Sequence, residues 1–481
     1  MLVVTLALTA CASGPDYVRP ALPLPAAYKE SGPWKPAEPQ LADTNHPWWA
    51  HYGDTELDTL VAQANEANQN IRMAEAQYRQ ARATAQLARA GYAPTLGAGT
   101  SIGRARTHTA PTPADSNALT LQASWEPDIW GRVQRSVEAG EAALQASEAD
   151  LAGARLSIQA ELVQDYLQLR ITDAEKDLIL RTVQEYEKAL SLTRSQYKAG
   201  VVTRADVALA ETQLQSARAQ AIDLDVRRTQ FEHAIAILTG RAPAEVTIAP
   251  RPSGTPGIAL PVMPGGLPSQ LLERRPDIAA AERRAAAANA QIGVAQSAYF
   301  PSLVLNASGG FASAGFSQWI TAPSRVWSLG AALAETIFDG GARSARTDQA
   351  VAAYDVAAAQ YKRTVLAGLQ EVEDNLAALR VLDAERAMQE SAVESARVAE
   401  RTSLARYRAG TTTYLSVVTA QTLLLSNERS ALQAFARQLA ASAALVKALG
   451  GGWNAAGLAA GADGSAAAPQ TTHVQTVPAG S

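Results

Sequence analysis

The chain has 481 residues, 47% of them hydrophobic, and its 42 basic and 46 acidic side chains give a formal net charge of −4. That balance argues against a nucleic-acid-binding protein, which normally carries a clustered basic excess. The single cysteine excludes a disulfide within the chain and a zinc site built from several cysteines. No phosphate-binding loop, catalytic triad or carboxylate pair stands out. We therefore expect no catalytic residue, no metal site and no cofactor-binding residue.

The chain opens with a segment typical of export signals. Residues 1–10 are almost wholly apolar but too few to cross a bilayer, and Cys11 follows them. Leu8-Thr9-Ala10-Cys11 is similar to the lipobox of bacterial lipoproteins, so Cys11 is expected to carry covalent acyl chains and to become the first residue of the mature chain. Several acyl chains on one residue anchor a protein stably. The alternative is the buried apolar start of a soluble protein.

The residues around this segment refine the prediction. Ala12 follows the cysteine, where an Asp would retain a bacterial lipoprotein in the inner membrane, so the outer membrane is favoured. No Lys or Arg precedes the apolar segment, and we therefore expect the true start of translation to lie upstream of Met1. Residues 12–47 are rich in proline and are expected to run extended rather than helical.

The rest of the chain repeats itself. The segment around Tyr92 recurs around Tyr299, and Gly200 recurs as Gly410, at an offset of about 210 residues. A joint rich in Pro and Gly separates the two copies. The predicted divisions are a signal peptide (1–10), a lipidated extended N-terminal arm (11–54), repeat 1 (55–243), a joint (244–266), repeat 2 (267–453) and a disordered tail (454–481).

Each copy is predicted to hold one helix, two short strands, a helix of about 65 residues and a final helix of about 37 residues. The expected helices lie near 55–90, 132–197 and 203–239 in the first copy and near 268–298, 341–407 and 413–449 in the second. At ~1.5 Å per residue the long helix measures ~100 Å, which favours a rod over a globular core. A seven-residue apolar repeat predicts that the helices coil around one another. The helices alone favour a soluble bundle or an extended coiled coil.

The short segments point to a membrane instead. Residues 95–102, 119–126, 303–311 and 327–333 alternate apolar and polar side chains with a period of two. Such segments fit transmembrane β-strands with one face in lipid and one toward a lumen. Four strands cannot close a barrel, and each open edge would leave roughly five N–H and C=O groups unpaired in lipid. The chain is therefore expected to share strands with copies of itself, in a dimer, a trimer or a tetramer.

Several short motifs are distributed along nearly the whole chain. They are Gly-Pro-Asp-Tyr-Val-Arg-Pro at 14–20, Trp-Trp at 48–49, Tyr-Gly-Asp at 52–54, Arg-Arg-Pro-Asp-Ile at 274–278, Ala-Gln-Ile-Gly-Val-Ala at 290–295, Tyr-Phe-Pro-Ser-Leu at 299–303 and two Tyr-x-x-Gly breaks. With them the chain resembles the TolC-like outer-membrane efflux channels, in the lipoprotein (NodT-type) branch of RND efflux systems. The resemblance implies a mainly α homotrimer with a small β part. Its twelve-stranded transmembrane β-barrel would continue into a twelve-helix periplasmic α-barrel, with the joint in an equatorial belt.

The resemblance also implies a function and partners. The channel would passively export small toxic compounds or drugs, received from an inner-membrane RND-type pump through a periplasmic adaptor (membrane fusion) protein. Its barrel would lie in outer-membrane lipid, with Trp125 and Trp327 as lipid-facing anchors or, alternatively, packed against protein. Other readings are a duct for heavy-metal efflux or type I protein secretion and, more remotely, a periplasmic structural coiled coil.

The same resemblance implies a working tip at the periplasmic ends of the helices, where the family meets its adaptor and closes the resting pore. The expected adaptor-facing residues are Tyr197, Gly200 and Gly410. The gate candidates are Asp206 and Arg204 in the first copy and Tyr407, Thr412, Ser416 and Thr419 in the second. Hydroxyl groups stand where the family has Arg or Asp, so hydroxyl hydrogen bonds or a polar constriction are expected there. Three Asp206 side chains are expected to form an anionic ring, unless Asp206 and Arg204 are simply solvated charges.

Overall fold

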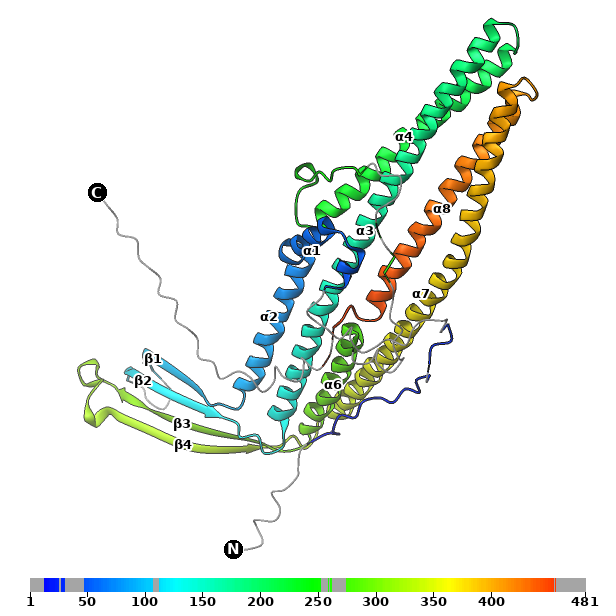
Figure 1. Ribbon diagram of the computed structural model, residues 1–481. Helices are drawn as coiled ribbons and strands as arrows, with labels where there is room; N and C mark the ends of the chain where they lie inside the picture. Colours follow the sequence, from blue (N-terminus) through cyan, green and yellow to red (C-terminus); the bar gives the residue numbers. More distant parts are fainter. Residues whose placement is uncertain are drawn as a thin grey trace, which may run out of the picture.

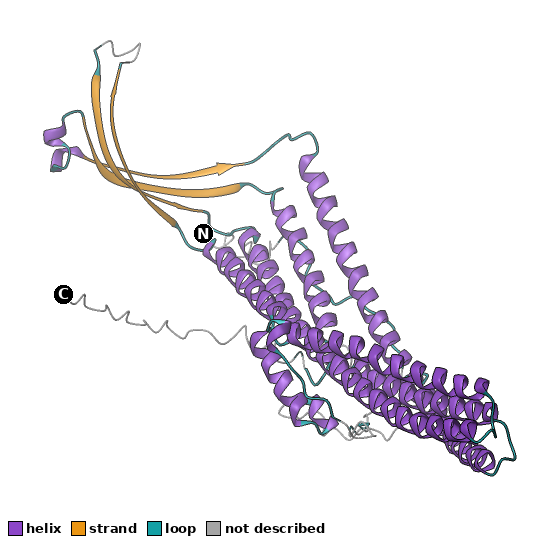
Figure 2. Cartoon of the chain, turned by 90° about the horizontal axis from the view of Figure 1, so that it is seen from above, coloured by secondary structure: helices purple, strands orange, loops and turns teal. Residues whose placement is uncertain are grey.

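The computed structural model describes residues 13–25, 27–30, 47–106, 112–251, 258, 260–261, 274–453 and 455. The predicted signal peptide, Cys11, much of the joint and nearly all of the tail lie outside these residues. The described chain is elongated and mainly helical. A curved four-stranded sheet stands at one end, and two long helical hairpins reach away from it (Figure 1 and Figure 2).

Two hairpins of equal size form the rod. α3 (Arg132–Lys198) and α7 (Ala342–Arg408) each contain 67 residues, and α4 (Arg204–Leu238) and α8 (Tyr414–Ala448) each contain 35. Gly200 and Gly410 turn the chain between the two helices of each hairpin with φ of 75° and 71°, a conformation that Gly adopts without a steric penalty. The predicted positions of these four helices are confirmed.

The helix predicted near 55–90 is instead two helices, α1 (Thr55–Ala67) and α2 (Gln69–Ala90). Asn68 lies between them with an extended backbone. Its side-chain oxygen accepts hydrogen bonds from two N–H groups of the first turn of α2, and its amide donates to the Leu238 carbonyl at 2.8 Å. A polar side chain that caps a new helix competes with continuation of the old one. The prediction of one continuous helix is wrong for that reason.

The second half begins its described helices with α6 (Pro276–Ser297), whose proline lies in the first turn, where a missing N–H breaks no hydrogen bond. α6 packs on α3 through small side chains, among them the buried Ala149 and Ala280. The largest apolar cluster lies where α1, α3, α4 and α8 meet, around residues such as Leu57 and Leu162. No helix of the described chain combines the length and hydropathy needed to cross a lipid bilayer.

The sheet contains β1 (Thr95–Ala105), β2 (Ala114–Trp125), β3 (Ser302–Ser313) and β4 (Arg325–Ala334), in that order. All neighbouring strands are antiparallel. Each predicted alternating segment falls on one strand, and the strands extend beyond the predicted segments by up to five residues at one end. The central pair, β2 with β3, joins the two halves of the chain, and β1 and β4 are the open edges.

Candidate functional site

The register of the sheet gathers apolar side chains on one face. Residues paired across an antiparallel sheet point to the same face, and successive residues alternate between faces. The apolar face carries mainly apolar residues, namely Leu96, Ala98, Ile102, Leu119, Leu121, Ala123, Trp125, Leu303, Leu305, Ala307, Phe311, Trp327, Leu329, Ala331 and Leu333. Thr100, Asn117, Ser313 and Arg325 lie on the same face, toward the strand ends away from the helices. The opposite face carries mainly small and polar residues, namely Thr95, Gly97, Gly99, Ser101, Thr120, Gln122, Ser124, Asn306, Ser308, Ser328 and Gly330.

The apolar face is not covered by the described part of the chain. Leu96 is 82% exposed, Trp327 78% and Leu329 76%. β1 and β4 each have one strand neighbour, so their outer edges present backbone groups that this sheet does not pair. Such groups cost several kcal/mol each in hydrocarbon. An apolar face with a polar opposite face is the pattern of β-strands embedded in membranes.

Trp125 and Trp327, the predicted lipid anchors, both lie on the apolar face. Trp125 ends β2 beside the helices, where its indole N–H donates to the Tyr92 carbonyl at 3.1 Å while the residue stays 39% exposed. Trp125 pairs with Leu305 on β3, and Trp327 pairs with Gly309, four residues further along the same strand. The two Trp residues are therefore separated by four residues along the direction of the strands. An apolar ring that is hydrogen-bonded at its N–H suits a membrane–water boundary. Lipid contact by either ring stays a prediction.

At the opposite end of the molecule, Asp206 caps helix α4. Its carboxylate accepts hydrogen bonds from the N–H and the hydroxyl of Thr203, at 2.9 and 2.7 Å, and its own N–H donates to the Thr203 hydroxyl at 3.3 Å. This reciprocal capping box stabilises the start of the helix. Both bonds to the carboxylate use Oδ2. The anionic ring stays a prediction. Arg204 begins α4 as an exposed residue.

Tyr407 and Tyr197 hold matching positions in the two hairpins but have different surroundings. Tyr407 is 3% exposed, its hydroxyl donates to Thr193 on α3 at 3.2 Å, and its ring centroid lies 5.3 Å from that of Tyr414. Burial raises the pKa of the Tyr407 hydroxyl above its usual value. Tyr197 is 46% exposed. Tyr407 therefore holds the two hairpins together, whereas Tyr197 presents its ring at the surface of the tip.

The three hydroxyl residues proposed for the second hairpin are bonded within that hairpin. Thr412 donates to Ser416 at 3.1 Å, and Thr419 donates to the Leu415 carbonyl one turn earlier at 2.9 Å. Neutral hydrogen bonds of this kind contribute about 1 kcal/mol each. These bonds shape the start of α8 and do not join it to the first hairpin.

A side chain that the sequence does not single out links the hairpins near the tip. The amide of Gln213 on α4 donates to the Tyr186 hydroxyl on α3 at 3.0 Å and to the Thr422 hydroxyl on α8 at 2.9 Å. One amide group thus connects three helices. Within the described chain, this contact and the buried Tyr407 hold the two hairpins together near the tip.

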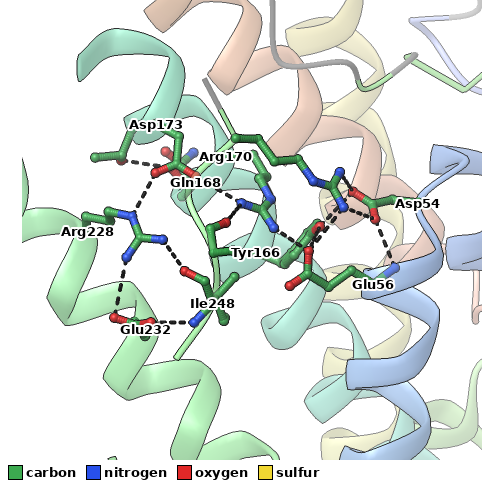
Figure 3. Close-up of polar contacts among 12 residues, drawn as sticks. Asp54, Glu56, Tyr166, Gln168, Arg170, Asp173, Arg228, Glu232 and Ile248 are labelled. Carbon is green, nitrogen blue, oxygen red and sulfur yellow. Dashed lines mark hydrogen bonds and ion pairs between the residues drawn. The ribbon is translucent and has the colours of Figure 1, made fainter. Parts of the chain in front are cut away.

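Another cluster missed from the sequence lies at the middle of the rod, around Arg170 of α3 (Figure 3). Arg170 is 2% exposed and donates to Glu56 at 2.5 Å, to Asp173 at 3.0 Å and to the Ala249 carbonyl at 2.9 Å. Glu56 lies in the first turn of α1, and Ala249 belongs to the joint. A buried guanidinium with several partners fixes the position of each element that supplies one.

Arg228 of α4 extends the cluster. It donates to Asp173 at 2.8 Å and to the Ile248 carbonyl, while Glu232 accepts the Ile248 N–H at 2.5 Å (Figure 3). Side chains of α3 and α4 therefore form hydrogen bonds with the backbone groups of residues 248–249 that a neighbouring strand would otherwise form. The result is that residues 248–249 are tied to both helices of the first hairpin.

Asp54 completes the cluster at the start of α1. Arg251 donates to both of its carboxylate oxygens, at 2.7 and 3.1 Å, and the Tyr166 hydroxyl donates at 2.6 Å. Burial alone would raise the pKa of the Asp54 carboxyl, but the hydrogen bonds from Arg251 and Tyr166 hold it below its usual value. Asp54 therefore remains ionised and keeps the joint attached to α1 at neutral pH.

Asp165, on the same part of α3, behaves in the opposite way. Burial raises its pKa to about 6, and the charge of Glu161 adds to the rise. Because the folded chain then binds this proton more tightly than the unfolded chain, stability should fall as the pH rises from about 4 to about 6. Asp165→Asn is expected to remove that dependence and to stabilise the protein at pH 7 by roughly 1–3 kcal/mol. Thermal unfolding across this pH range tests it, and an unchanged pH profile in the variant would contradict the assignment.

The family of the chain follows from a direct match. A protein-family model described as outer membrane efflux protein matches residues 60–241 and 267–451. The chain belongs to the outer membrane efflux protein family. The match covers both halves of the described sheet and both hairpins. It confirms the resemblance noted from the sequence motifs and shows the protein to be an outer-membrane efflux protein.

Individual members of the family align over nearly the whole chain. Pyoverdine export outer membrane protein OpmQ of Pseudomonas aeruginosa is 32% identical over 461 residues, which cover 93% of this chain and 95% of OpmQ. Toluene efflux pump outer membrane protein TtgF of Pseudomonas putida is 30% identical over 472 residues, 94% of this chain and 96% of TtgF. The structure of the outer-membrane channel OprN is 32% identical and matches with a TM-score of 0.86 over 92% of this chain and 100% of that one.

Proposed function

We propose that three copies of this chain close into the outer-membrane channel of a tripartite efflux pump. The observation that carries the proposal is the sheet, whose apolar face ends in two open edges. Three such sheets, joined β4 to β1, make a barrel of twelve strands. The attached helices of 67 residues extend ~100 Å, long enough to reach far into the periplasm.

The two halves of the chain support the pseudo-sixfold shape that such a duct needs. α2 and α6 have 22 residues each, α3 and α7 have 67, and α4 and α8 have 35. In each half the two shorter helices run beside the long one (Figure 1). We attribute this correspondence to an internal duplication. In each half the long helix counts as one rod, and the two shorter helices, end to end, count as a second. Each chain then contributes four helical rods to the wall of the duct, and a trimer contributes twelve.

The partners and the cargo follow from the two ends of the duct. The exposed Tyr197 and the turns at Gly200 and Gly410 lie furthest from the sheet and would meet a periplasmic adaptor, through which an inner-membrane RND-type pump delivers its substrate. The names of OpmQ and TtgF refer to pyoverdine and toluene. These cargoes differ in polarity, which is consistent with a wide duct that does not bind what it carries. We propose small toxic compounds or drugs as the cargo.

The proposed lipid anchor at Cys11 fits the position of the next described residue. The Ser13 hydroxyl lies within hydrogen-bond distance of the carbonyls of Trp130 and Gly293, at 3.0 and 2.9 Å, beside the start of α3. Two residues reach at most about 7 Å. Acyl chains on Cys11 would therefore start at the level where the strands meet the helices, which is the membrane boundary in this proposal.

Asp206→Asn tests the proposed anionic ring. The substitution keeps a hydrogen-bonding side chain at the start of α4 but removes three negative charges from the trimer. We expect a lower preference for cations in single-channel recordings, because a ring of like charges concentrates counter-ions at a constriction. Glu211→Gln, which removes a charge further along α4, is the control. Identical conductance and selectivity in wild type and Asp206→Asn would remove the ring.

Drug sensitivity tests the function itself. Cells that lack the gene should accumulate apolar dyes and antibiotics, and the wild-type gene should restore their export. A chain that carries Leu329→Lys on the apolar face should fail to restore it. Unchanged accumulation after deletion, across chemically different compounds and with no other duct compensating, would contradict the proposal.

A further inference from the structure

Loops at the junction of sheet and helices cover one another within the chain. Trp130, between β2 and α3, stacks on Phe300, between α6 and β3, with ring centroids 5.0 Å apart and an interplanar angle of 12°. The indole N–H of Trp130 also donates to the Pro301 carbonyl at 2.6 Å. The loop between β2 and α3 therefore packs against the loop between α6 and β3.

The corresponding contact is absent among the described residues at the open edge beyond β4. Ile337 and Phe338, in the loop between β4 and α7, are 94% and 89% exposed. On the opposite edge, Tyr92 in the loop between α2 and β1 is 47% exposed. Large apolar side chains that stand this far into solvent side by side mark a surface that another molecule covers.

The loop between β4 and α7 is held in position by contacts of Asp339 and Arg343. The Asp339 carboxylate accepts the N–H groups of Gly341 and Arg343, at 3.1 and 3.0 Å. The guanidinium of Arg343 in turn lies over the Tyr299 ring, 5.4 Å from its centroid. The contact of Arg343 with Tyr299 joins this loop to the loop between α6 and β3 of the same chain. These contacts involve neither Ile337 nor Phe338, which stay exposed.

We infer that Ile337 and Phe338 of one copy pack against residues 91–94 of the next copy, as Trp130 packs against Phe300 within the chain. This inference rests on the proposed closure of copies into a ring, in which the loop after β4 meets the loop before β1. Ala93 occupies the sequence position that corresponds to Phe300. The methyl group in place of a phenyl ring leaves room for the ring of Phe338, so in this joint only the loop that follows the strands contributes a large ring.

A disulfide between subunits tests the contact in the full-length protein in detergent. After oxidation, Ala93→Cys/Phe338→Cys should give a ladder that ends at a covalent trimer on a non-reducing gel, and reduction should return the monomer. Each single variant should give no trimer, because a closed ring needs two free thiols per chain and acylation, as proposed, blocks the sulfur of Cys11. Ala93→Cys/Val356→Cys is the matched control, since Val356 is 70% exposed but lies about 20 Å along α7. Tyr92→Cys/Ile337→Cys repeats the test with a second pair.

The mass of the same particles separates this inference from the proposed closure. A trimer mass with a ladder from either tested pair, and none from the control, supports the contact. A trimer mass with no ladder from either tested pair would overturn the contact, while closure would stand. A monomer mass would overturn closure and the contact together.

Discussion

Leu329→Lys should strongly reduce assembly in the outer membrane, whereas Ser328→Lys should not. Leu329 lies on the apolar face and is 76% exposed in the single chain, so a lysine there would place its charge in hydrocarbon. Near the membrane centre this costs about 2–4 kcal/mol, and a trimer meets the cost three times. The amount of heat-modifiable trimer in outer-membrane fractions measures the effect.

Ser328 is the matched control because it differs only in the face it occupies. Its hydroxyl lies 2.8 Å from that of Ser308 on the polar face, where a lysine would point into water. Ser328→Lys should assemble normally and shift the selectivity of reconstituted channels toward anions, since charged groups that line a pore set its ion preference. Equal loss of trimer in both variants would contradict the assignment of the two faces.

Arg170→Ala should destabilise the middle of the rod by about 3 kcal/mol. Removing one partner from a buried ion pair typically costs about 3–5 kcal/mol because the other charge is left buried. Here Asp173 keeps Arg228 and Glu56 keeps Arg251, at 2.8 and 3.1 Å, so we expect the lower end of that range. Thermal unfolding followed by circular dichroism measures the loss. Limited proteolysis should cut the joint faster in the variant, because its bond from Arg170 to Ala249 is gone.

Arg155→Ala is the control for that variant. Arg155 belongs to the same helix and pairs with Glu75 at 2.6 Å, but both side chains are nearly half exposed. Exposed ion pairs contribute at most about 1 kcal/mol. If both variants unfold at the same temperature as the wild type, the cluster around Arg170 does not hold the joint.

The strands and the long helices could be predicted because their signal is periodic. Alternation along 95–102 or 327–333 extends over enough residues to identify a strand, and its apolar half proved to be one continuous face. The absence of proline and the apolar repeat defined the long helices in the same way. A single residue can end a helix without changing the periodic pattern around it. The break between α1 and α2 at Asn68 was therefore not predicted.

The contacts between distant segments could not be predicted from the sequence. Gln213 lies 209 residues from Thr422, and nothing near either residue indicates that their side chains meet. Arg170 has the same ambiguity, because a lone arginine in a long helix is usually a solvated side chain. Its burial depends on three elements that come together only in the folded chain. The different fates of Tyr197 and Tyr407 show that matching sequence positions in a duplicated chain need not share a role.

The number of chains in the purified particle tests the central claim most directly. Light scattering or native mass spectrometry of the protein in detergent should give a protein mass of three chains, each of 50.5 kDa less the cleaved signal peptide. The trimer should separate into monomers only on heating, because closure pairs the edges of β1 and β4. A monodisperse monomer that stays in solution after the detergent is removed would contradict the account.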